Sequence, residues 1–343
     1  MSLLDGNRLR EIVSKIRGKS ALVIGDLMVD RYVSISARKL SREAPVPVGD
    51  FQKEELNLGG ASNLANNIVA LGGKANVVGF VGNDSQGEWI RSALDKIGVQ
   101  PKHIQTGSRP TTLKTRYFVN GSQYLRVDRE VRSDIDSGLS DSLLKSTSSL
   151  LPDCDIVAIA DYDKGTITSY LVDGLVASAK AAGKKIIAQP KVRHYMDLRG
   201  VDYIKSNERE ASIVTGISVL NESGLKNIAT NLATRLDYRG LLLTRGEKGI
   251  TVFEQNSMAT IPPFTLPGEF ARAVGIRDAM TSVMTLALAS EANAFEAAAL
   301  SNLAASKRAE RVGTIVVNPD DIVEKLRTIE KNLLSIEKMP VRR

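Results

Sequence analysis

The sequence predicts an α/β fold in which a mostly parallel central sheet has helices on both faces and carries a small antiparallel β flap. Short β-branched runs alternate with helical segments along most of the chain, an order typical of a parallel sheet covered on both sides. Two extended stretches of partly alternating polarity, residues 31–57 and 110–129, interrupt this order and predict the flap. With 343 residues, 43% of them hydrophobic, the chain can bury the core that such a fold needs.

Short apolar runs are the predicted strands of the central sheet, and a polar or glycine-containing turn follows each of them. In chain order the runs are residues 21–26, 76–82, 155–161, 184–190, 201–207 and 240–246. Ligands of an open parallel sheet bind beyond the carboxyl ends of its strands. The polar residues after each run are therefore the candidates for a site.

Helical segments separate most of these runs. The segments with the clearest pattern are residues 61–73, 169–185 and 209–220. In the first of them Leu64, Ile68 and Leu71 recur at helical spacing and form one apolar stripe. These stripes predict helices that pack on the sheet.

The flap stretches favour paired strands. The second contains Asn120-Gly121, a dipeptide that favours a tight hairpin turn. Such a flap commonly acts as a lid or a dimer surface, although a plain structural excursion gives the same pattern. Because no Pro-rich or low-complexity linker occurs, we expect one domain over residues 1–335, with the flap stretches inserted, and a basic tail over 336–343.

Composition narrows the class of partner. The formal net charge is +7, but lysines and arginines are scattered and aromatic residues make up only 5% of the chain. The basic and aromatic interleaving of nucleic-acid binding is therefore missing, and we expect a phosphorylated small molecule instead. A basic surface that is merely solvated remains the alternative.

Cysteine usage and hydropathy indicate the compartment. Cys154 is the single cysteine, so an intrachain disulfide is excluded. The first twenty residues lack the apolar core of a signal peptide, and no apolar run approaches the ~18 residues of a membrane span. We therefore expect a cytoplasmic protein with no membrane partner.

Two early motifs suit a hydroxylated ligand. Gly59 and Gly60 open a helix and permit close backbone approach, and the amide of Asn63 follows them. Asp26 ends the first strand, and Asp30 comes four residues later, where a carboxylate would accept hydrogen bonds from sugar hydroxyls. A helix N-cap turn is the alternative for the glycine pair, and a helix cap is the alternative for the aspartates.

Two later motifs suit a metal ion and phosphates. Asn207 and Glu210 lie three residues apart, and an amide oxygen with a carboxylate suits Mg²⁺, usually through bridging waters. Thr244, Gly246 and Gly249 belong to a strand–turn–strand pattern whose backbone amides would face phosphates. A helix cap and an ordinary hairpin are the respective alternatives.

The last motif is a glycine turn before a long apolar helix. Gly275 precedes Asp278, and free N–H groups at a helix start stabilise negative charge. Asp278 would equally serve as the N-cap of that helix. Arg277 stands where the closest backbone approach to an anion is wanted.

Taken in order, these motifs resemble the PfkB/ribokinase family of carbohydrate kinases. The matching residues are Gly59-Gly60 with Asn63, Asn207-x-x-Glu210, Thr244-x-Gly246-x-x-Gly249 and Gly275-Ile276-Arg277-Asp278. Within the family, the stretches GDLMVDRYV, LNLGGASNLANNIVALGG, LKTRYFVNGSQYLRVD and ADYDKGTIT resemble the kinases that phosphorylate heptose 7-phosphate for ADP-heptose and lipopolysaccharide synthesis. The resemblance implies a ribokinase-like fold and an ATP-dependent sugar kinase.

The resemblance also implies a role for each motif. Asp278 would be the general base that takes the proton of the sugar hydroxyl. The backbone amides of Gly275, Ile276 and Arg277 would stabilise the transferring phosphoryl group. ATP would lie beside Thr244, Gly246 and Gly249, with Asn302 near the adenine, and Mg²⁺ near Asn207 and Glu210.

For the sugar phosphate the resemblance implies a site between the first motifs and the flap. The sugar would contact Asp30, Gly59, Gly60 and Asn63, and its phosphate would contact Lys114, Arg116 and Arg126. Arginine suits phosphate because its guanidinium donates two parallel hydrogen bonds. Members of the family also lead us to expect a homodimer formed through the flap.

Three positions depart from the family pattern. Arg277 replaces a glycine, Ala279 replaces a small hydroxyl residue, and Gln189 replaces an aspartate that ends the fourth strand in the heptose kinases. If position 277 needs a left-handed backbone, arginine costs roughly 1–2 kcal/mol there. Its side chain would either bind the anion, as an arginine finger does, or fill the site and exclude the γ-phosphate.

These departures leave three hypotheses for function. The first is a sugar or sugar-phosphate kinase, and the second is a kinase-fold protein that binds sugar phosphate or nucleotide with little turnover. The third is a kinase for another acceptor, such as a nucleoside or a fructose phosphate.

Overall fold

The main sheet runs through the centre of the molecule, and its strands are apolar on both faces. The computed structural model describes residues 4–264, 275–309, 316–333 and 339–340. The sheet has the order β14-β13-β12-β11-β10-β9-β8-β1-β4-β5, parallel from β11 to β5 and antiparallel from β11 to β14. Its strands are β1 (Ser20–Gly25), β4 (Lys74–Gly82), β5 (Ile104–Gly107), β8 (Ile156–Ala160), β9 (Lys185–Gln189), β10 (Tyr203–Asn207), β11 (Gly240–Thr244), β12 (Ile250–Glu254), β13 (Ser257–Ile261) and β14 (Met339–Pro340).

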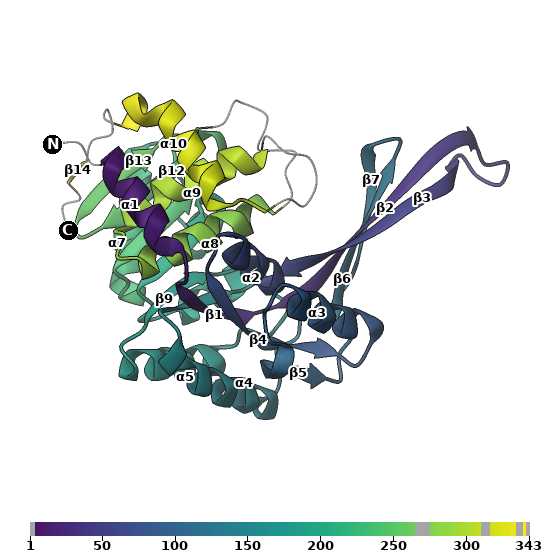
Figure 1. Ribbon diagram of the computed structural model, residues 1–343, viewed down its shortest axis with the longest axis horizontal. Coiled ribbons are helices and arrows are strands. Elements are labelled where there is room, and N and C mark those ends of the chain that lie inside the picture. Colours follow the sequence, from purple (N-terminus) through teal and green to yellow (C-terminus); the bar gives the residue numbers. More distant parts are fainter. Residues whose placement is uncertain (1–3, 265–274, 310–315, 334–338, 341–343) are drawn as a thin grey trace.

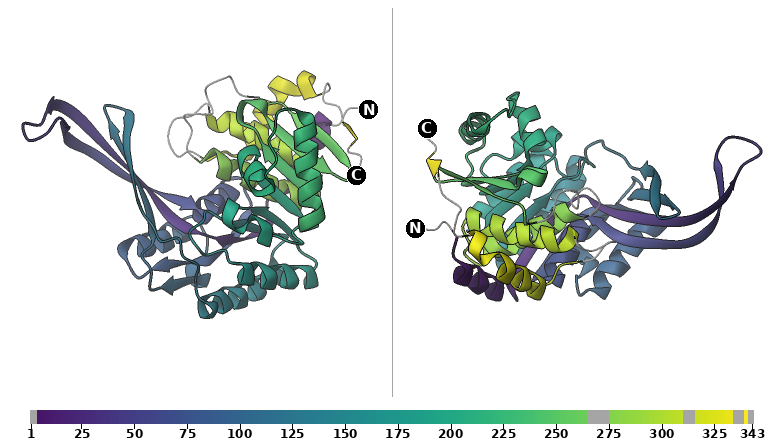
Figure 2. Two further views of the ribbon diagram at one scale, coloured as in Figure 1. Left: turned by 180° about the vertical axis from the view of Figure 1, so that it is seen from behind. Right: turned by 90° about the horizontal axis from the view of Figure 1, so that it is seen from above.

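Helices cover both faces of this sheet (Figure 2). On β1, Val23 belongs to one apolar core, and its neighbours Leu22 and Ile24 belong to the other. One face is covered by α1 (Gly6–Ile16), α2 (Ala61–Ala70), α3 (Ser85–Lys96), α8 (Ile276–Ala289), α9 (Ala294–Ala309) and α10 (Pro319–Leu333). The other face is covered by α4 (Ser137–Leu150), α5 (Ser169–Ala181), α6 (Glu208–Thr215) and α7 (Glu222–Leu236).

The flap projects from the body as a long arm (Figure 1). It consists of β2 (Leu27–Leu40), β3 (Pro47–Gly60), β6 (Thr112–Val119) and β7 (Ser122–Arg129), in the order β3-β2-β6-β7. Its two hairpins are antiparallel, and β2 joins them by pairing with β6 in parallel. Asn120 and Gly121 both have positive φ, 48° and 82°, as a type I′ hairpin turn requires. The predicted hairpin is therefore confirmed.

The predicted strands and helices are present with small changes in length. The helix expected over residues 209–220 is α6, which ends at Thr215 because Gly216 takes a left-handed conformation with φ 70°. In the segment expected as a basic tail, Met339–Pro340 pairs with β13 as β14, and residues 336–338 and 341–343 lie outside the described part of the chain. None of the helices in the described ranges has the length and apolar character needed to cross a membrane.

Candidate active site

Two helix N-termini meet at the carboxyl edge of the main sheet. Helix α2 begins directly after flap strand β3, and it packs against α8. The amide of Asn63, in the first turn of α2, donates to Asp278 Oδ2 at 2.6 Å from the first turn of α8. Both side chains are buried. The structure thus brings together two predicted site residues that lie 215 positions apart in the sequence.

Asp278 is held through both of its carboxylate oxygens. The hydroxyl of Tyr162, in the loop between β8 and α5, donates to Asp278 Oδ1. Burial raises the pKa of Asp278 above its ordinary value, and the bonds from Tyr162 and Asn63 and the nearby Lys205 offset only part of this effect. Asp278 is therefore an oriented carboxylate with a raised pKa. It does not cap α8, whose N-terminus has no side-chain cap among the residues that the structure describes.

Gly275 and Arg277 shape the start of α8. Gly275 has φ +86°, a conformation that residues with a side chain avoid, so a glycine is required there. Arg277 lies inside the helix and does not have a positive φ, so the expected cost of a left-handed arginine does not arise. The first-turn amides of Ile276, Arg277 and Asp278 point out of the uncapped helix end, where they and the helix dipole favour an anion.

The glycine pair before α2 makes room for protein atoms. A Cβ on Gly59 would lie 2.7 Å from Asp30 Oδ2, and one on Gly60 would lie 2.4 Å from the carbonyl oxygen of Asp26. Gly60 also has φ +59°. The close approach predicted for a ligand at these glycines is therefore used at least in part by the two aspartates.

Asp26 organises the loop that carries Tyr162. Its buried carboxylate accepts three backbone N–H groups, from Tyr162 at 2.7 Å, Lys164 at 3.2 Å and Thr166 at 3.0 Å. Burial and the charge of Asp26 raise the pKa of the neighbouring Asp161 to about 6. Asp26 therefore has a structural role here, in place of the sugar contact or the helix cap considered from the sequence.

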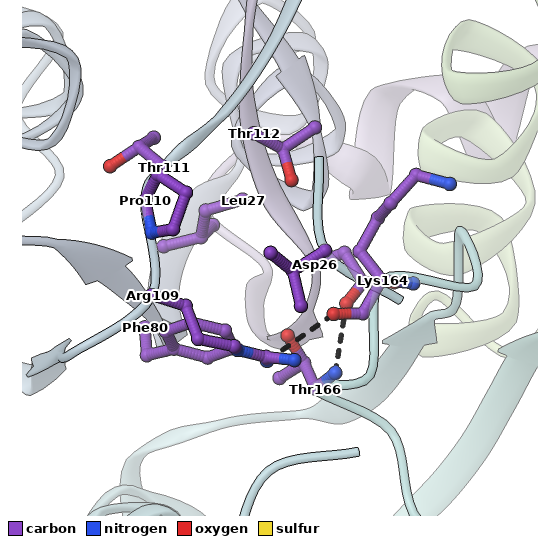
Figure 3. A pocket seen from close by; sticks show the side chains of 10 residues that line it. Asp26, Leu27, Phe80, Arg109, Pro110, Thr111, Thr112, Lys164 and Thr166 are labelled. Atoms are coloured by element: carbon purple, nitrogen blue, oxygen red, sulfur yellow. Dashed lines mark hydrogen bonds between the residues drawn. The ribbon is translucent and has the colours of Figure 1, made fainter. Parts of the chain in front are cut away.

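A small cavity of about 10 Å³ lies beside Asp26, where the flap joins the body (Figure 3). Asp26, Lys164 and Thr166 line it from one side, and Arg109 and Phe80 line it from another. A space of this size holds about one water molecule. It is too small for a sugar or a nucleotide.

Asp30 is paired with one of the predicted phosphate ligands. Arg116 Nη1 lies 2.5 Å from Asp30 Oδ1, and both side chains are largely buried. The Arg116 guanidinium also stacks over the Tyr32 ring, 5.3 Å from its centroid. Asp30 and Arg116, which come from the paired strands β2 and β6, therefore act as a unit.

The other two predicted phosphate ligands are also paired with carboxylates. Lys114 Nζ lies 2.8 Å from both Asp128 Oδ2 and Glu130 Oε2, and Arg126 Nε lies 3.0 Å from Asp128 Oδ1. Although burial opposes it, Lys114 and its basic neighbours lower the pKa of Glu130 to about 2. The flap thus gathers three predicted basic residues, each neutralised within the protein.

The predicted metal ligands do not fit a directly bound Mg²⁺. Asn207 Oδ1 accepts the backbone N–H of Glu210 at 2.7 Å as the N-cap of α6. Glu210 Oε1 lies 2.8 Å from Lys191 Nζ and 3.2 Å from Arg277 Nη2, and Glu210 Oε2 lies 3.2 Å from Ser206 Oγ. Despite burial, these two cations lower the pKa of Glu210, so the carboxylate is charged. A divalent cation at Glu210 would meet two positive charges.

The predicted nucleotide turn lies beside the Asn207–Glu210 segment. Thr244 pairs with Asn207 across β11 and β10, and Thr244 Oγ1 donates to the carbonyl of Ser206 at 3.1 Å. Gly246 has φ +58° and opens a short turn, and a Cβ on it would meet no atom of the described residues within 4 Å. A Cβ on Gly249 would lie 2.0 Å from the Ile261 carbonyl oxygen, so this glycine is required by packing.

Asn302, the predicted adenine contact, holds backbone in this structure. It is buried in α9, and its amide donates to the carbonyls of Ile261 at 3.2 Å and Pro262 at 3.0 Å. Those donors secure the end of β13. Asn302 lies near the predicted nucleotide turn because it contacts the end of β13, and β13 pairs with β12, the strand that follows this turn.

Sequence reasoning missed Lys205, which lies beneath the site. Its ammonium is buried 3.0 Å from Gln189 Oε1, and Thr281 Oγ1 donates to the same oxygen at 2.5 Å. Burial, with the charge of Arg277, lowers the pKa of Lys205 to about 7. The sequence did carry a signal, because Lys205 lies within a predicted strand of the central sheet, where a lysine is unusual.

The fold belongs to the ribokinase-like class of α/β architectures. The chain superposes on Arabidopsis thaliana ribokinase complexed with ribose and ATP with a TM-score of 0.68 and 17% identity, over 91% of this chain and 99% of that one. It superposes on Escherichia coli phosphofructokinase-2 in complex with substrates and products with a TM-score of 0.73 and 18% identity, over 91% and 99% of the two chains. At this identity the similarity shows the fold.

The chain belongs to the pfkB family of carbohydrate kinases, whose family model matches residues 19–321. Among its relatives is a "Bifunctional protein HldE" of Helicobacter hepaticus, 34% identical over 91% of this chain and 64% of the relative. A protein of the same name from Caulobacter vibrioides is 37% identical over 89% of this chain and 63% of the relative. The chain therefore spans less than two thirds of the length of these relatives.

Proposed function

We propose that this carbohydrate kinase transfers the γ-phosphate of ATP to a hydroxyl of a sugar phosphate, with heptose 7-phosphate as the expected acceptor. The observation that carries the proposal is the placement of Asp278, buried and oriented by Asn63 and Tyr162 in the first turn of an uncapped helix. A base and an anion site thus lie within one helical turn. The similarity to the HldE proteins supports the choice of acceptor.

In the proposed mechanism Asp278 accepts the proton of the attacking hydroxyl. A raised pKa makes a carboxylate a stronger base, provided that the pH keeps it ionised. Tyr162 and Asn63 hold both oxygens, so the base is oriented before the substrate binds. The first-turn amides of α8 are expected to stabilise the charge on the transferring phosphoryl group.

ATP is expected to lie along the turn that contains Gly246, with its phosphates toward the start of α8. The open space over Gly246 and the adjacent end of β10 support this direction. Mg²⁺ accompanies ATP in most kinases and neutralises its phosphates. Because Glu210 already carries two cations, no step is assigned to a metal at Asn207 and Glu210.

The sugar phosphate is expected to bind between the start of α2 and the flap. Asp30 would accept hydrogen bonds from sugar hydroxyls, and Arg116 and Lys114 would exchange carboxylates for the phosphate of the acceptor. Such an exchange is favourable because a phosphate carries more charge than one carboxylate and accepts bidentate bonds from arginine. The neighbouring carboxylates keep these cations in place before binding.

A second candidate function is binding of sugar phosphate or nucleotide with little turnover. The contact of Arg277 with Glu210 favours it, because the guanidinium then lies beside the start of α8. Formation of ADP separates the two functions, measured with ATP and heptose 7-phosphate, fructose 6-phosphate or a nucleoside as acceptor. We expect ADP only with heptose 7-phosphate. Tight binding of that sugar without ADP formation would establish the binding function instead.

Replacing Tyr162 by Phe is expected to shift the pH dependence of catalysis. The Tyr162 hydroxyl lowers the pKa of Asp278, so its removal raises that pKa further. The base must be ionised, and kcat therefore falls as the pH drops through its pKa. We expect the acid limb of the kcat profile to move to higher pH in Tyr162→Phe. In the control Tyr170→Phe, which removes an exposed hydroxyl bonded to Asp141, the limb should not move; an unmoved or lowered limb in Tyr162→Phe would contradict the assignment.

We further propose that the flap forms a homodimer. Most of the exposed large apolar side chains of the described residues lie on the flap strands and the turn between β2 and β3, namely Leu40, Val46, Val48, Phe51, Tyr124, Leu125 and Val127. Such a concentration is typical of an interface. Light scattering should show a dimer for the unchanged chain and a monomer for Phe51→Glu. Leu220→Glu, on an even more exposed apolar residue outside the flap, should remain dimeric.

A further inference from the structure

The side chain of Arg277 contacts Glu210, the carboxylate predicted from the sequence as a Mg²⁺ ligand. Arg277 lies in the first turn of α8, and Glu210 lies in the first turn of α6. Arg277 Nη2 is 3.2 Å from Glu210 Oε1 and 3.4 Å from Glu210 Oε2. The guanidinium is therefore shared between both carboxylate oxygens of Glu210.

A second cation completes the arrangement. Lys191, which follows β9, places its ammonium 2.8 Å from Glu210 Oε1. Two positive groups thus surround one carboxylate, which leaves this cluster with a net charge of about +1 at neutral pH. The Arg277 side chain remains 41% exposed, so its guanidinium faces solvent as well as Glu210. A positive, partly exposed group of this kind is suited to an incoming polyanion.

The position of this cluster relates it to phosphates. The backbone of Arg277 belongs to the helix start that favours an anion, and its side chain extends from there toward the ends of β10 and β11. Phosphoryl transfer needs positive charge near the phosphates, and either a metal ion or an arginine can supply it. A guanidinium also donates paired hydrogen bonds to phosphate oxygens.

We propose that Arg277, supported by Lys191, takes the place of a divalent cation at Glu210, so that this chain binds the phosphates of a nucleoside diphosphate or triphosphate without a metal at that carboxylate. The inference rests on the proposed nucleotide site. In this proposal Arg277 contacts a phosphate, and Glu210 holds Arg277 in position. Nucleotide affinity should therefore depend on Arg277 and hardly on Mg²⁺.

The test is isothermal titration of the full chain with ADP, in buffer with Mg²⁺ and in buffer with EDTA. For the unchanged chain we expect the two Kd values to agree within about threefold. For Arg277→Gly we expect the affinity in EDTA to fall by about tenfold or more, the size of one charge-assisted hydrogen bond, and Mg²⁺ to restore it. Arg8→Gln is the matched control, because Arg8 is paired with Glu11 at 3.0 Å on α1. We expect this variant to bind ADP as the unchanged chain does.

Binding of Mn²⁺, followed by electron paramagnetic resonance, gives a readout without nucleotide. We expect the unchanged chain to leave the signal of free Mn²⁺ intact and Arg277→Gly to reduce it. Stoichiometric Mn²⁺ binding by the unchanged chain that disappears in Glu210→Gln would overturn the proposal. The proposal would also be overturned if the unchanged chain lost its ADP affinity in EDTA. It would likewise be overturned if Arg277→Gly bound ADP and the unchanged chain did not.

The outcomes separate this proposal from the proposed function. ADP binding without metal, together with no phosphorylation of any sugar, would support the role of Arg277 and contradict the kinase reaction. Phosphorylation of heptose 7-phosphate by a chain whose ADP affinity requires Mg²⁺ would support the kinase reaction and contradict the role of Arg277.

Discussion

Asp278→Asn is expected to lower kcat by about 10²–10⁴-fold, the range typical of a lost general base. The amide keeps the size of the carboxylate, so the packing around the buried side chain is retained. It accepts no proton, however, and therefore the attacking hydroxyl has no base. The rate of ADP formation with heptose 7-phosphate, measured at saturating substrates, checks this expectation.

The Kd for ADP should change little in Asp278→Asn, because the variant removes a base and leaves the nucleotide contacts in place. The matched control is Asp136→Asn, which changes an exposed N-cap aspartate of α4 and should keep the full rate. If Asp278→Asn retained the full rate, Asp278 would not be the base. The anion site at the start of α8 would then stand without its catalytic partner.

The second large effect concerns stability. Asp26→Ala is expected to lower the free energy of unfolding by roughly 3 kcal/mol or more, because buried N–H groups that lose their acceptor cost about 1–3 kcal/mol each. Three such groups, on Tyr162, Lys164 and Thr166, donate to the Asp26 carboxylate. Unfolding in urea, followed by circular dichroism, measures the change.

Asp136→Ala provides the scale for this prediction. Asp136 also accepts a backbone N–H, from Leu139 at 2.8 Å, but at an exposed helix start. Its loss should cost about 1 kcal/mol, as for an ordinary N-cap. A cost for Asp26→Ala no larger than that of Asp136→Ala would contradict the structural role of Asp26. Because the same loop carries Tyr162, the activity of Asp26→Ala should also fall.

Much of the fold could be predicted from the sequence. The apolar runs that became β1, β4, β8, β9, β10 and β11 are local patterns, and Asn120-Gly121 prefers a tight turn wherever the flanking strands pair. The end of α6 was predicted too late, since residues 217–220 continue an apolar pattern beyond Gly216. The parallel pairing of β2 with β6 was not predicted, because it joins segments about 80 residues apart.

The structure brings some of the predicted site residues into contact, but the contacts themselves were not predicted. Asn63 and Asp278 were both named, and they touch in the structure. Tyr162 and Lys205 were not named as site residues, although they adjoin Asp278 through a hydrogen bond and through charge. A tyrosine after a strand has many common roles, and its position beside Asp278 follows only from the loop that Asp26 holds.

The sequence by itself determined the order of strands and helices, the presence of the flap and the family motifs, because periodicity and turn preference are properties of neighbouring residues. Only the tertiary structure decided what the charged side chains contact. Arg277 and Glu210 are 67 positions apart, and Arg116 and Asp30 are 86 positions apart, yet each pair is in contact. The pairing of charges depends on strand register and helix packing, so no local pattern in the chain specifies that Arg277 reaches the carboxylate predicted for a metal.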